Sequence, residues 1–352
     1  MTAPTRLIRL TRALAVLAVA GLAASACSSD SGNKLNASGS TFQATFDAAA
    51  INGFKSTPAG KGVTINYGGG GSGKGKTDLQ SKTVDFAGTD SLPKPEELSG
   101  YQGGALVYIP TVAAPITVSY NVSGVDSLKL SPRTVAGIFS GTITKWNDAA
   151  IAKDNPDATL PATNITIVHR SDASGTTSNF SKYLADAGGS AWTLGTPGDT
   201  VNWPTSSSQG GTGNAGVAQI VSSTDGAIGY VDFADAKNAK LKYASIKNKA
   251  GNFIEPTVAS AAAAVAAATV GTDLSYSPLN TAGPQAYPIT SPTWIIAYVN
   301  QSNKDKGTAL KDFLTYVLND GQNLAEANNY AKLPDSLRQK AIAQVDKLQI
   351  PA

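Results

Sequence analysis

The sequence contains one cysteine, Cys27, one histidine, His169, and one methionine, the initiator, among its 352 residues. One cysteine allows no disulfide within the chain. One cysteine and one histidine also fall short of the clusters that bind zinc or iron. We therefore expect neither a structural disulfide nor a metal site, and no cofactor.

Long apolar runs are also scarce. After the N-terminal segment no stretch reaches the roughly 18 apolar residues of a spanning helix, since even the Ala-rich run Ala259–Val270 is too short. The N-terminus itself has three arginines before the apolar run Ala13–Leu22, which ends in small residues. This pattern is typical of an export signal, and we assign residues 1–26 to a signal peptide.

Cys27 directly follows Ala24-Ser25-Ala26, where a bacterial lipoprotein signal places the residue that is acylated. An ordinary cleavage site beside a cysteine is the alternative, and Ala24 is a less usual choice than Leu at its position. We favour the lipobox because an exported chain that otherwise avoids cysteine keeps one here. Residues 27–36 are then a flexible tether, and the protein is lipid-anchored on the outer face of the cytoplasmic membrane.

The chain has no excess of charge of either sign once the signal is removed. Residues 1–26 hold three of the 28 basic residues and none of the 25 acidic ones, so 25 basic residues remain from Cys27 onward. A basic face for nucleic acid is therefore not expected, and an anion would have to be held by local geometry.

Apolar runs typical of strands alternate with helical patterns along most of the chain, which predicts an α/β fold. The expected strands are Val63–Tyr67, Thr83–Ala87, Ile116–Tyr120, Ile165–His169, Ala227–Val231 and Trp294–Val299. The expected helices are Thr134–Phe139, one after Ser174, Thr308–Leu318 and Ser336–Leu348. The Gly/Ser/Thr-rich stretch Ser206–Asn214 is interpreted as a surface connection near the site.

Three segments combine glycine with serine or threonine just before a predicted helix: Ser38-Gly39-Ser40-Thr41-Phe42, Gly70-Gly71-Ser72-Gly73 and Ser174-Gly175-Thr176-Thr177. The first amides of a helix have no intrahelical partner and bind oxyanions readily, and glycine allows a close backbone approach. Each segment alone is more often a simple N-cap. Three in one chain favour an anion site.

The second segment also matches the nucleotide-binding pattern G-x-x-x-x-G-K-T at Gly70, Gly75, Lys76 and Thr77. The helix that should follow, Asp78–Lys82, is expected to be polar and barely one turn long. A P-loop helix is long and packs on its sheet, so we do not favour an NTPase.

The densest cluster of chemically active residues is His169-Arg170-Ser171-Asp172-Ala173-Ser174-Gly175-Thr176. Arg170 offers a planar fork for a tetrahedral oxyanion, and Asp172 is near enough to orient it. The alternative is a surface Arg–Asp pair of little energetic value. Neighbouring strand residues point to opposite faces and the pattern G-x-S-x-G is absent, so we interpret His169 as structural.

Asp90 ends the segment Val84–Asp90 and would repel an anion, unless that anion carries a proton. Hydrogen phosphate has a proton to donate to a carboxylate, whereas sulfate has none. Asp90 is therefore a candidate for selecting phosphate. The alternative is a cap for the turn Ser91-Leu92-Pro93.

With these residues in view, the chain resembles the PstS family, the substrate-binding proteins of phosphate-specific ABC importers, from about Leu35 to the C-terminal region. The remaining blocks that carry the resemblance are Thr144-Lys145-Trp146-Asn147-Asp148, Gly226-Ala227-Ile228-Gly229-Tyr230-Val231, Tyr287-Pro288-Ile289-Thr290-Ser291 and Leu333-Pro334-Asp335-Ser336. Departures from the family pattern lie beside the motifs: Gln43 stands where Pro is usual, and Gly73-Lys74 follow Ser72.

The resemblance implies a two-lobed type II periplasmic-binding fold with a mixed sheet in each lobe. Lobe I would comprise residues 37–112 plus 288–352 and lobe II residues 113–287. The implied phosphate contacts are Thr41, Phe42, Ser72, Asp90, Arg170, Ser174, Gly175 and Thr176, with Asp172 supporting Arg170.

The resemblance also implies a monomer that captures inorganic phosphate outside the cell and delivers it to permease and ATPase subunits. Two other functions stay open. A phosphatase or phosphoryl-transfer enzyme would use the same anion cradle, although a nucleophile with its base is not evident. A phosphate-sensing or adhesion module without transport would look the same in sequence.

Overall fold

The computed structural model describes residues 33–352, so the predicted signal peptide, Cys27 and most of the tether lie outside the described residues. The described chain forms one compact unit. Its strands form a nine-stranded sheet and a small three-stranded sheet. Within residues 33–352, no helix has the length and apolar character needed to cross a bilayer.

One group of strands and helices, called lobe I below, contains both ends of the described chain. Its strands run in the order β2-β1-β3-β12-β4, with β1 parallel to β2 and β3, and β12 antiparallel to β3 and β4. The sheet of lobe I is therefore mixed. The bounds of these strands are β1 Lys34–Gly39, β2 Thr64–Gly70, β3 Phe86–Thr89, β4 Leu106–Asn121 and β12 Thr290–Tyr298.

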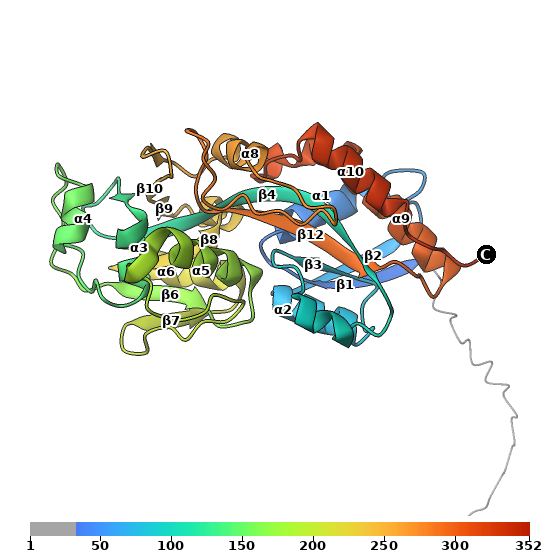
Figure 1. Ribbon diagram of the computed structural model, residues 1–352, viewed down its shortest axis with the longest axis horizontal. Coiled ribbons are helices and arrows are strands. Elements are labelled where there is room, and N and C mark those ends of the chain that lie inside the picture. The colour runs from blue at the N-terminus through green and yellow to red at the C-terminus, as the bar shows by residue number, and fades with distance from the viewer. Residues whose placement is uncertain (1–32) are drawn as a thin grey trace, which may run out of the picture. The chain divides into compact units, whose positions relative to one another are not determined.

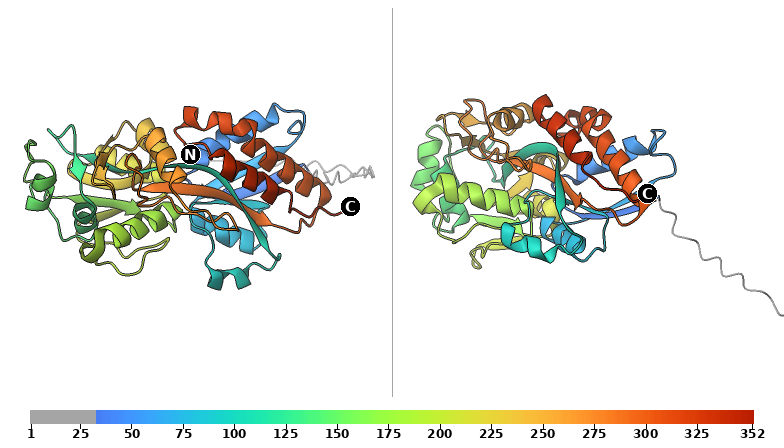
Figure 2. Two further views of the ribbon diagram at one scale, coloured as in Figure 1. Left: turned by 45° about the horizontal axis from the view of Figure 1, so that its top comes forward. Right: turned by 45° about the vertical axis from the view of Figure 1, so that its right-hand side comes forward.

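Helices cover this sheet and connect its strands. Figures 1 and 2 show the C-terminal helices beside the strands of lobe I in all views. Strands β3 and β12 are buried along their whole length. The helices are α1 Ala44–Lys55, α2 Ser72–Gln80, α9 Lys304–Leu318 and α10 Asp335–Val345, with short 3₁₀ turns at Pro95–Gly100, Asp320–Leu324 and Glu326–Asn328.

The second group, lobe II, is built on the order β4-β8-β6-β7, with β9 also paired to β4. Strand β8 is antiparallel to β4 and parallel to β6, so this part of the sheet is mixed as well. The strands are β6 Thr166–Arg170, β7 Ser208–Gly211, β8 Ala227–Asp232 and β9 Lys242–Tyr243, and the small sheet has β5 Lys129–Leu130, β10 Ser245–Lys247 and β11 Phe253–Ile254. The helices are α3 Pro132–Phe139, α4 Ala149–Asp154, α5 Gly175–Gly188, α6 Gly213–Ser223, α7 Phe233–Asn238 and α8 Val258–Ala266, with a 3₁₀ turn at Gly189–Ala191.

A single long strand, β4, joins the two lobes (Figure 1). Its residues up to Pro115 pair with β12, and its residues from Ile116 onward pair with β8. The fold is therefore the predicted two-lobed α/β arrangement with a mixed sheet in each lobe.

Two expectations about local structure are wrong. The short helix expected at Asp78–Lys82 is the nine-residue α2, which begins at Ser72, so Lys76 of the nucleotide-binding pattern lies inside a helix. Helical hydrogen bonds such as that from Gly75 N to Gly71 O occupy this backbone, and no P-loop forms around Lys76. The stretch Ser206–Asn214 is likewise not a surface connection, because it forms β7 and starts α6.

Candidate functional site

The three glycine-containing segments all lie where a strand leads into a helix. The junctions are β1 to α1, β2 to α2 and β6 to α5. Among the residues that the structure describes, the backbone N–H groups of Thr41, Ser72, Gly175 and Thr176 have no hydrogen-bond partner. Such groups at the starts of α2 and α5 are suited to an oxyanion ligand, and Thr41 lies in the turn that leads into α1.

The side chain of Arg170 is buried at the end of β6, with 4% of the residue exposed. Its Nε donates to Asp172 Oδ1 over 2.8 Å, and its Nη2 pairs with Asp172 Oδ2. Burial disfavours the Asp172 carboxylate, but hydrogen bonds and charge from Arg170 outweigh it and lower the Asp172 pKa. Asp172 thus contacts two nitrogens of the Arg170 guanidinium, which holds it in one orientation.

A tyrosine of β8 fixes the backbone around Arg170. The Tyr230 hydroxyl accepts from the Arg170 N–H over 3.0 Å and lies 2.6 Å from Thr177 Oγ1 in the first turn of α5. Its ring stacks on Phe180 with 4.6 Å between centroids. A buried aromatic side chain therefore connects the end of β6 to the first turn of α5.

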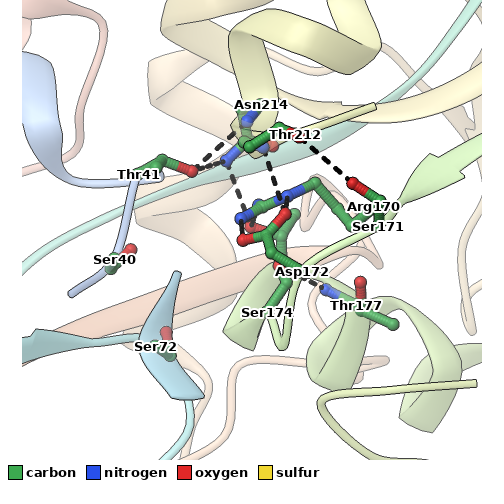
Figure 3. Close-up of polar contacts among 12 residues, drawn as sticks. Ser40, Thr41, Ser72, Arg170, Ser171, Asp172, Ser174, Thr177, Thr212 and Asn214 are labelled. Carbon is green, nitrogen blue, oxygen red and sulfur yellow. Dashed lines mark hydrogen bonds and ion pairs between the residues drawn. The ribbon is translucent and has the colours of Figure 1, made fainter. Parts of the chain in front are cut away.

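Asn214 is a site residue that sequence reasoning missed. Its backbone N and its Nδ2 donate to Thr41 Oγ1 over 3.2 and 3.1 Å, and its Nδ2 also donates to Thr176 Oγ1 over 3.2 Å. Thr176 Oγ1 in turn accepts from Arg170 Nη1 over 3.3 Å. Figure 3 shows Thr41 and Asn214 converging near Arg170, with Ser40 and Ser72 on the same side of Arg170 as Thr41.

A pattern in the sequence could have indicated that Asn214 belongs to the site. Its stretch is rich in glycine, serine and threonine like the other three segments, and Asn214 begins a fourth strand-to-helix junction, from β7 to α6. The Gly213 N–H also donates to Asp172 Oδ1 over 3.1 Å, so this junction supports the Arg170–Asp172 pair as well.

Asp90 lies at the end of β3 and is buried, with 2% exposed. Its Oδ1 accepts from the Ser40 hydroxyl, and its backbone N–H donates to Ser72 Oγ over 3.1 Å. Ser72 Oγ also lies 3.5 Å from Asp90 Oδ2. Burial raises the pKa of Asp90 to about 7, although the Ser40 hydrogen bond and the Arg170 charge act in the opposite direction.

Glycine is required at position 175 by the close approach of the two lobes. A Cβ atom there would lie 2.4 Å from Ser72 Oγ and 2.8 Å from Asp90 Oδ2. Asn179, also on α5, donates from Nδ2 to the Asp90 carbonyl over 2.7 Å. The start of α5 in lobe II therefore lies directly against the Ser72 and Asp90 groups of lobe I.

The other predicted residues have defined positions. Ser174 caps α5 by accepting from the Thr177 N–H over 3.2 Å. The Phe42 N–H donates to Ser40 Oγ over 3.0 Å and the Phe42 carbonyl accepts from the Tyr330 hydroxyl over 2.6 Å, so Phe42 shapes the loop of Thr41. His169 stacks on Trp203 at 5.6 Å, which is consistent with a structural role.

The arrangement combines a guanidinium held by Asp172, several unpartnered backbone amides, neighbouring serine and threonine hydroxyls, and one buried carboxyl group. Most of these groups can donate hydrogen bonds, as a tetrahedral oxyanion requires. The carboxyl group is suited to an anion that carries a proton. Among residues 33–352, no group of three histidine, cysteine or acidic residues is placed to bind a metal ion.

The PBP superfamily domain matches residues 23–321 of the chain. The phosphate-binding protein PstS of Pasteurella multocida is 38% identical over 291 residues, which cover 80% of this chain and 82% of that protein. The phosphate-binding protein PstS3 of Mycobacterium bovis is 34% identical over 334 residues, covering 91% of this chain and 88% of that protein.

Solved structures of phosphate-binding proteins share the fold of this chain. A high-affinity periplasmic phosphate-binding protein called PfluDING, solved with phosphate, has a TM-score of 0.72 at 24% identity and covers 88% of this chain and 93% of its own. The phosphate-binding protein of Stenotrophomonas maltophilia has a TM-score of 0.67 at 23% identity, with the same coverage. Taken with the two relatives above 30% identity and the matching domain, these findings mean that the chain belongs to the PstS family of phosphate-binding proteins, within the PBP superfamily.

Proposed function

We propose that this protein binds inorganic phosphate, as hydrogen phosphate, between its two lobes. The ligand contacts in this proposal are Thr41, Phe42, Ser72, Asp90, Arg170, Ser174, Gly175 and Thr176, with Asp172 orienting Arg170. The single observation that carries the proposal is the convergence of Arg170 with the unpartnered helix-start amides of both lobes. The named relatives support the choice of phosphate.

The proposed basis of selectivity is the single proton shared between Asp90 and the ligand. Ser40 occupies Oδ1 of the carboxyl group, which leaves Oδ2 to accept a proton from hydrogen phosphate. Sulfate offers no proton at neutral pH, so an ionised Asp90 would repel it.

The proposed cellular role is delivery of phosphate to an ABC importer by a lipid-anchored protein outside the cytoplasmic membrane. Release then requires the lobes to separate, with residues 112–115 and 287–289 as the proposed crossings. Strand β4 changes partner from β12 to β8 next to the first of these, which supports placing a hinge there. Neither catalysis nor a partner copy is part of this proposal.

The binding proposal is tested by calorimetry on the full-length protein in detergent with phosphate, sulfate and ATP. One phosphate per chain, weak or absent sulfate binding and no ATP binding are expected. Preferential binding of ATP, or release of phosphate from a generic phosphomonoester, would contradict the proposal and revive the enzyme alternative.

The anchor is tested separately, because Cys27 lies outside the described residues. If Cys27 is acylated, the wild type partitions into the detergent phase while Cys27→Ala stays in the aqueous phase. Equal partitioning of the two proteins would show that Cys27 is not lipidated.

A further inference from the structure

Lys76, the lysine of the apparent nucleotide-binding pattern, makes an ion pair between the lobes. Its Nζ lies 2.8 Å from Asp199 Oδ2, and 3.7 Å from Glu97 Oε2 of its own lobe. Asp199 belongs to the segment that follows α5 in lobe II. The pair borders a cavity of about 340 Å³ that both lobes line, together with Lys94, Lys182 and Ser178.

This pair is largely shielded from water. The Lys76 side chain is 11% exposed and that of Asp199 is 18% exposed. Lys74, two residues away on α2, pairs with Asp78 inside the same helix, and its side chain is 53% exposed. An exposed pair contributes little, whereas removing one partner of a shielded pair leaves an uncompensated charge and costs more.

Both partners are attached to the elements that carry the proposed phosphate contacts. Lys76 lies one turn after Ser72 on α2, and residues four apart share a helix face. The Asp199 carbonyl accepts from the Ser174 N–H over 2.9 Å, directly before the first turn of α5. Separating Lys76 from Asp199 therefore moves the start of α2 away from the start of α5.

We infer that Lys76 and Asp199 form a clasp between the lobes that sets the rate at which bound phosphate leaves. The inference rests on the proposed function. Phosphate enters while the lobes are apart and the clasp is open, but it leaves only after the ion pair has broken. The clasp therefore acts on the dissociation rate more than on the association rate, and its two residues are positioning residues rather than ligand contacts.

The clasp also affects the charge around Asp90. Burial is the main cause of the raised Asp90 pKa, and the Asp199 carboxylate acts in the same direction. Lys76 lies against that carboxylate. A lysine at position 76 thus offsets negative charge near the ligand.

The test measures release of radiolabelled inorganic phosphate from the full-length protein in detergent, after dilution into unlabelled phosphate. Lys76→Met should raise the dissociation rate about 10-fold and change the association rate less than about 2-fold. Asp199→Asn should have a similar effect from the other lobe. Lys76→Arg should restore most of the wild-type rate because it keeps the charge.

Lys74→Met is the matched control, since it removes a lysine from the same helix without touching the other lobe. The double variant Lys76→Met, Asp199→Asn should release phosphate no faster than either single variant, because the two residues act through one contact. The clasp would be overturned if Lys76→Met released phosphate at the same rate as Lys74→Met. Additive effects in the double variant would overturn it as well. Neither result would contradict phosphate binding. A wild type that binds no phosphate would instead overturn the proposed function, and the clasp with it.

Discussion

Both lobes present backbone amides to the candidate site, but lobe II adds a positive charge, whereas lobe I adds a buried carboxyl group between two hydroxyls. In lobe II, Arg170 and the start of α5 face the site, and Asp172 fixes the guanidinium. In lobe I, Asp90 lies beside Ser40 and Ser72. Positive charge attracts any anion, but an ionised carboxylate accepts only an anion that brings a proton. Affinity should therefore depend mainly on lobe II and selectivity on lobe I.

The two lobes nevertheless hold their site residues by the same means. A buried tyrosine hydroxyl fixes the backbone on each side: Tyr230 accepts from Arg170 in lobe II, and Tyr67 donates to the Ser40 carbonyl over 2.8 Å in lobe I. The difference between the lobes thus lies in the groups that they present and not in how rigidly they present them.

The largest effect is expected from Arg170→Ala, which removes the charge of lobe II. Hydrogen bonds to charged groups contribute roughly 1.5 to 3 kcal/mol each, so phosphate affinity should fall at least about 100-fold. The affinity for sulfate should fall by a similar factor, since the guanidinium does not distinguish the two anions. Calorimetry would measure both affinities, with Arg133→Ala at an exposed arginine as control. If only the affinity for phosphate fell, the proposal that lobe II determines affinity and lobe I selectivity would be contradicted.

A smaller and selective effect is expected from Asp90→Asn. The affinity for phosphate should fall about 10- to 100-fold because one charge-assisted hydrogen bond is lost. The affinity for sulfate should rise because the repulsion from the carboxylate is gone. Competition binding at neutral pH measures the ratio. An unchanged preference for phosphate would mean that Asp90 only caps its turn.

The same variant tests a pH dependence. Burial raises the Asp90 pKa to about 7. Below that pH the carboxyl group is protonated and can donate a hydrogen bond to sulfate instead of repelling it. Wild-type preference for phosphate over sulfate should therefore decline as the pH falls through about 7. Asp90→Asn should lack the part of this decline that Asp90 contributes, since its side chain has no proton to exchange.

The smallest effect on binding is expected from Asp47→Asn, the matched control for Asp90. Asp47 is a second buried carboxyl group of lobe I, but it accepts from Gln43 Nε2 over 2.9 Å and makes no contact with the proposed ligand groups. Phosphate affinity should change less than about 2-fold. A change as large as that of Asp90→Asn would show that any buried carboxyl group of lobe I affects binding.

Stability, by contrast, should respond to Asp47→Asn. Burial raises the Asp47 pKa from 3.8 to about 7, so the folded protein binds a proton more tightly than the unfolded one and loses stability as pH rises from about 4 to 7. Asparagine carries no charge, so the variant should exceed the wild type in free energy of unfolding by about 2 to 4 kcal/mol at pH 8. Denaturant titrations at pH 4 and pH 8 would show whether this advantage disappears at the lower pH.

The local parts of the site were predictable because local rules produce them. Glycine with serine or threonine before a helical pattern indicated the junctions at Thr41, Ser72 and Gly175, and an Arg two residues from an Asp indicated their pairing. The strand expected at Thr83–Ala87 is β3 at Phe86–Thr89, a shift that arises because pairing with β1 and β12 decides where a short buried strand begins.

The sequence by itself determined the α/β alternation, the junctions rich in glycine and hydroxyl groups, and the residue types that suit a protonated oxyanion. Only the tertiary structure decided which junctions meet. Asn214 contacts Thr41 across 173 positions of sequence, and Gly175 lies against Ser72 and Asp90, because strand order brings these ends together. Lys76 illustrates the same limit, since its pattern suggested a nucleotide loop while its helix directs it to Asp199 in the other lobe. Residues distant in sequence leave no shared local pattern, so their contacts depend on packing alone.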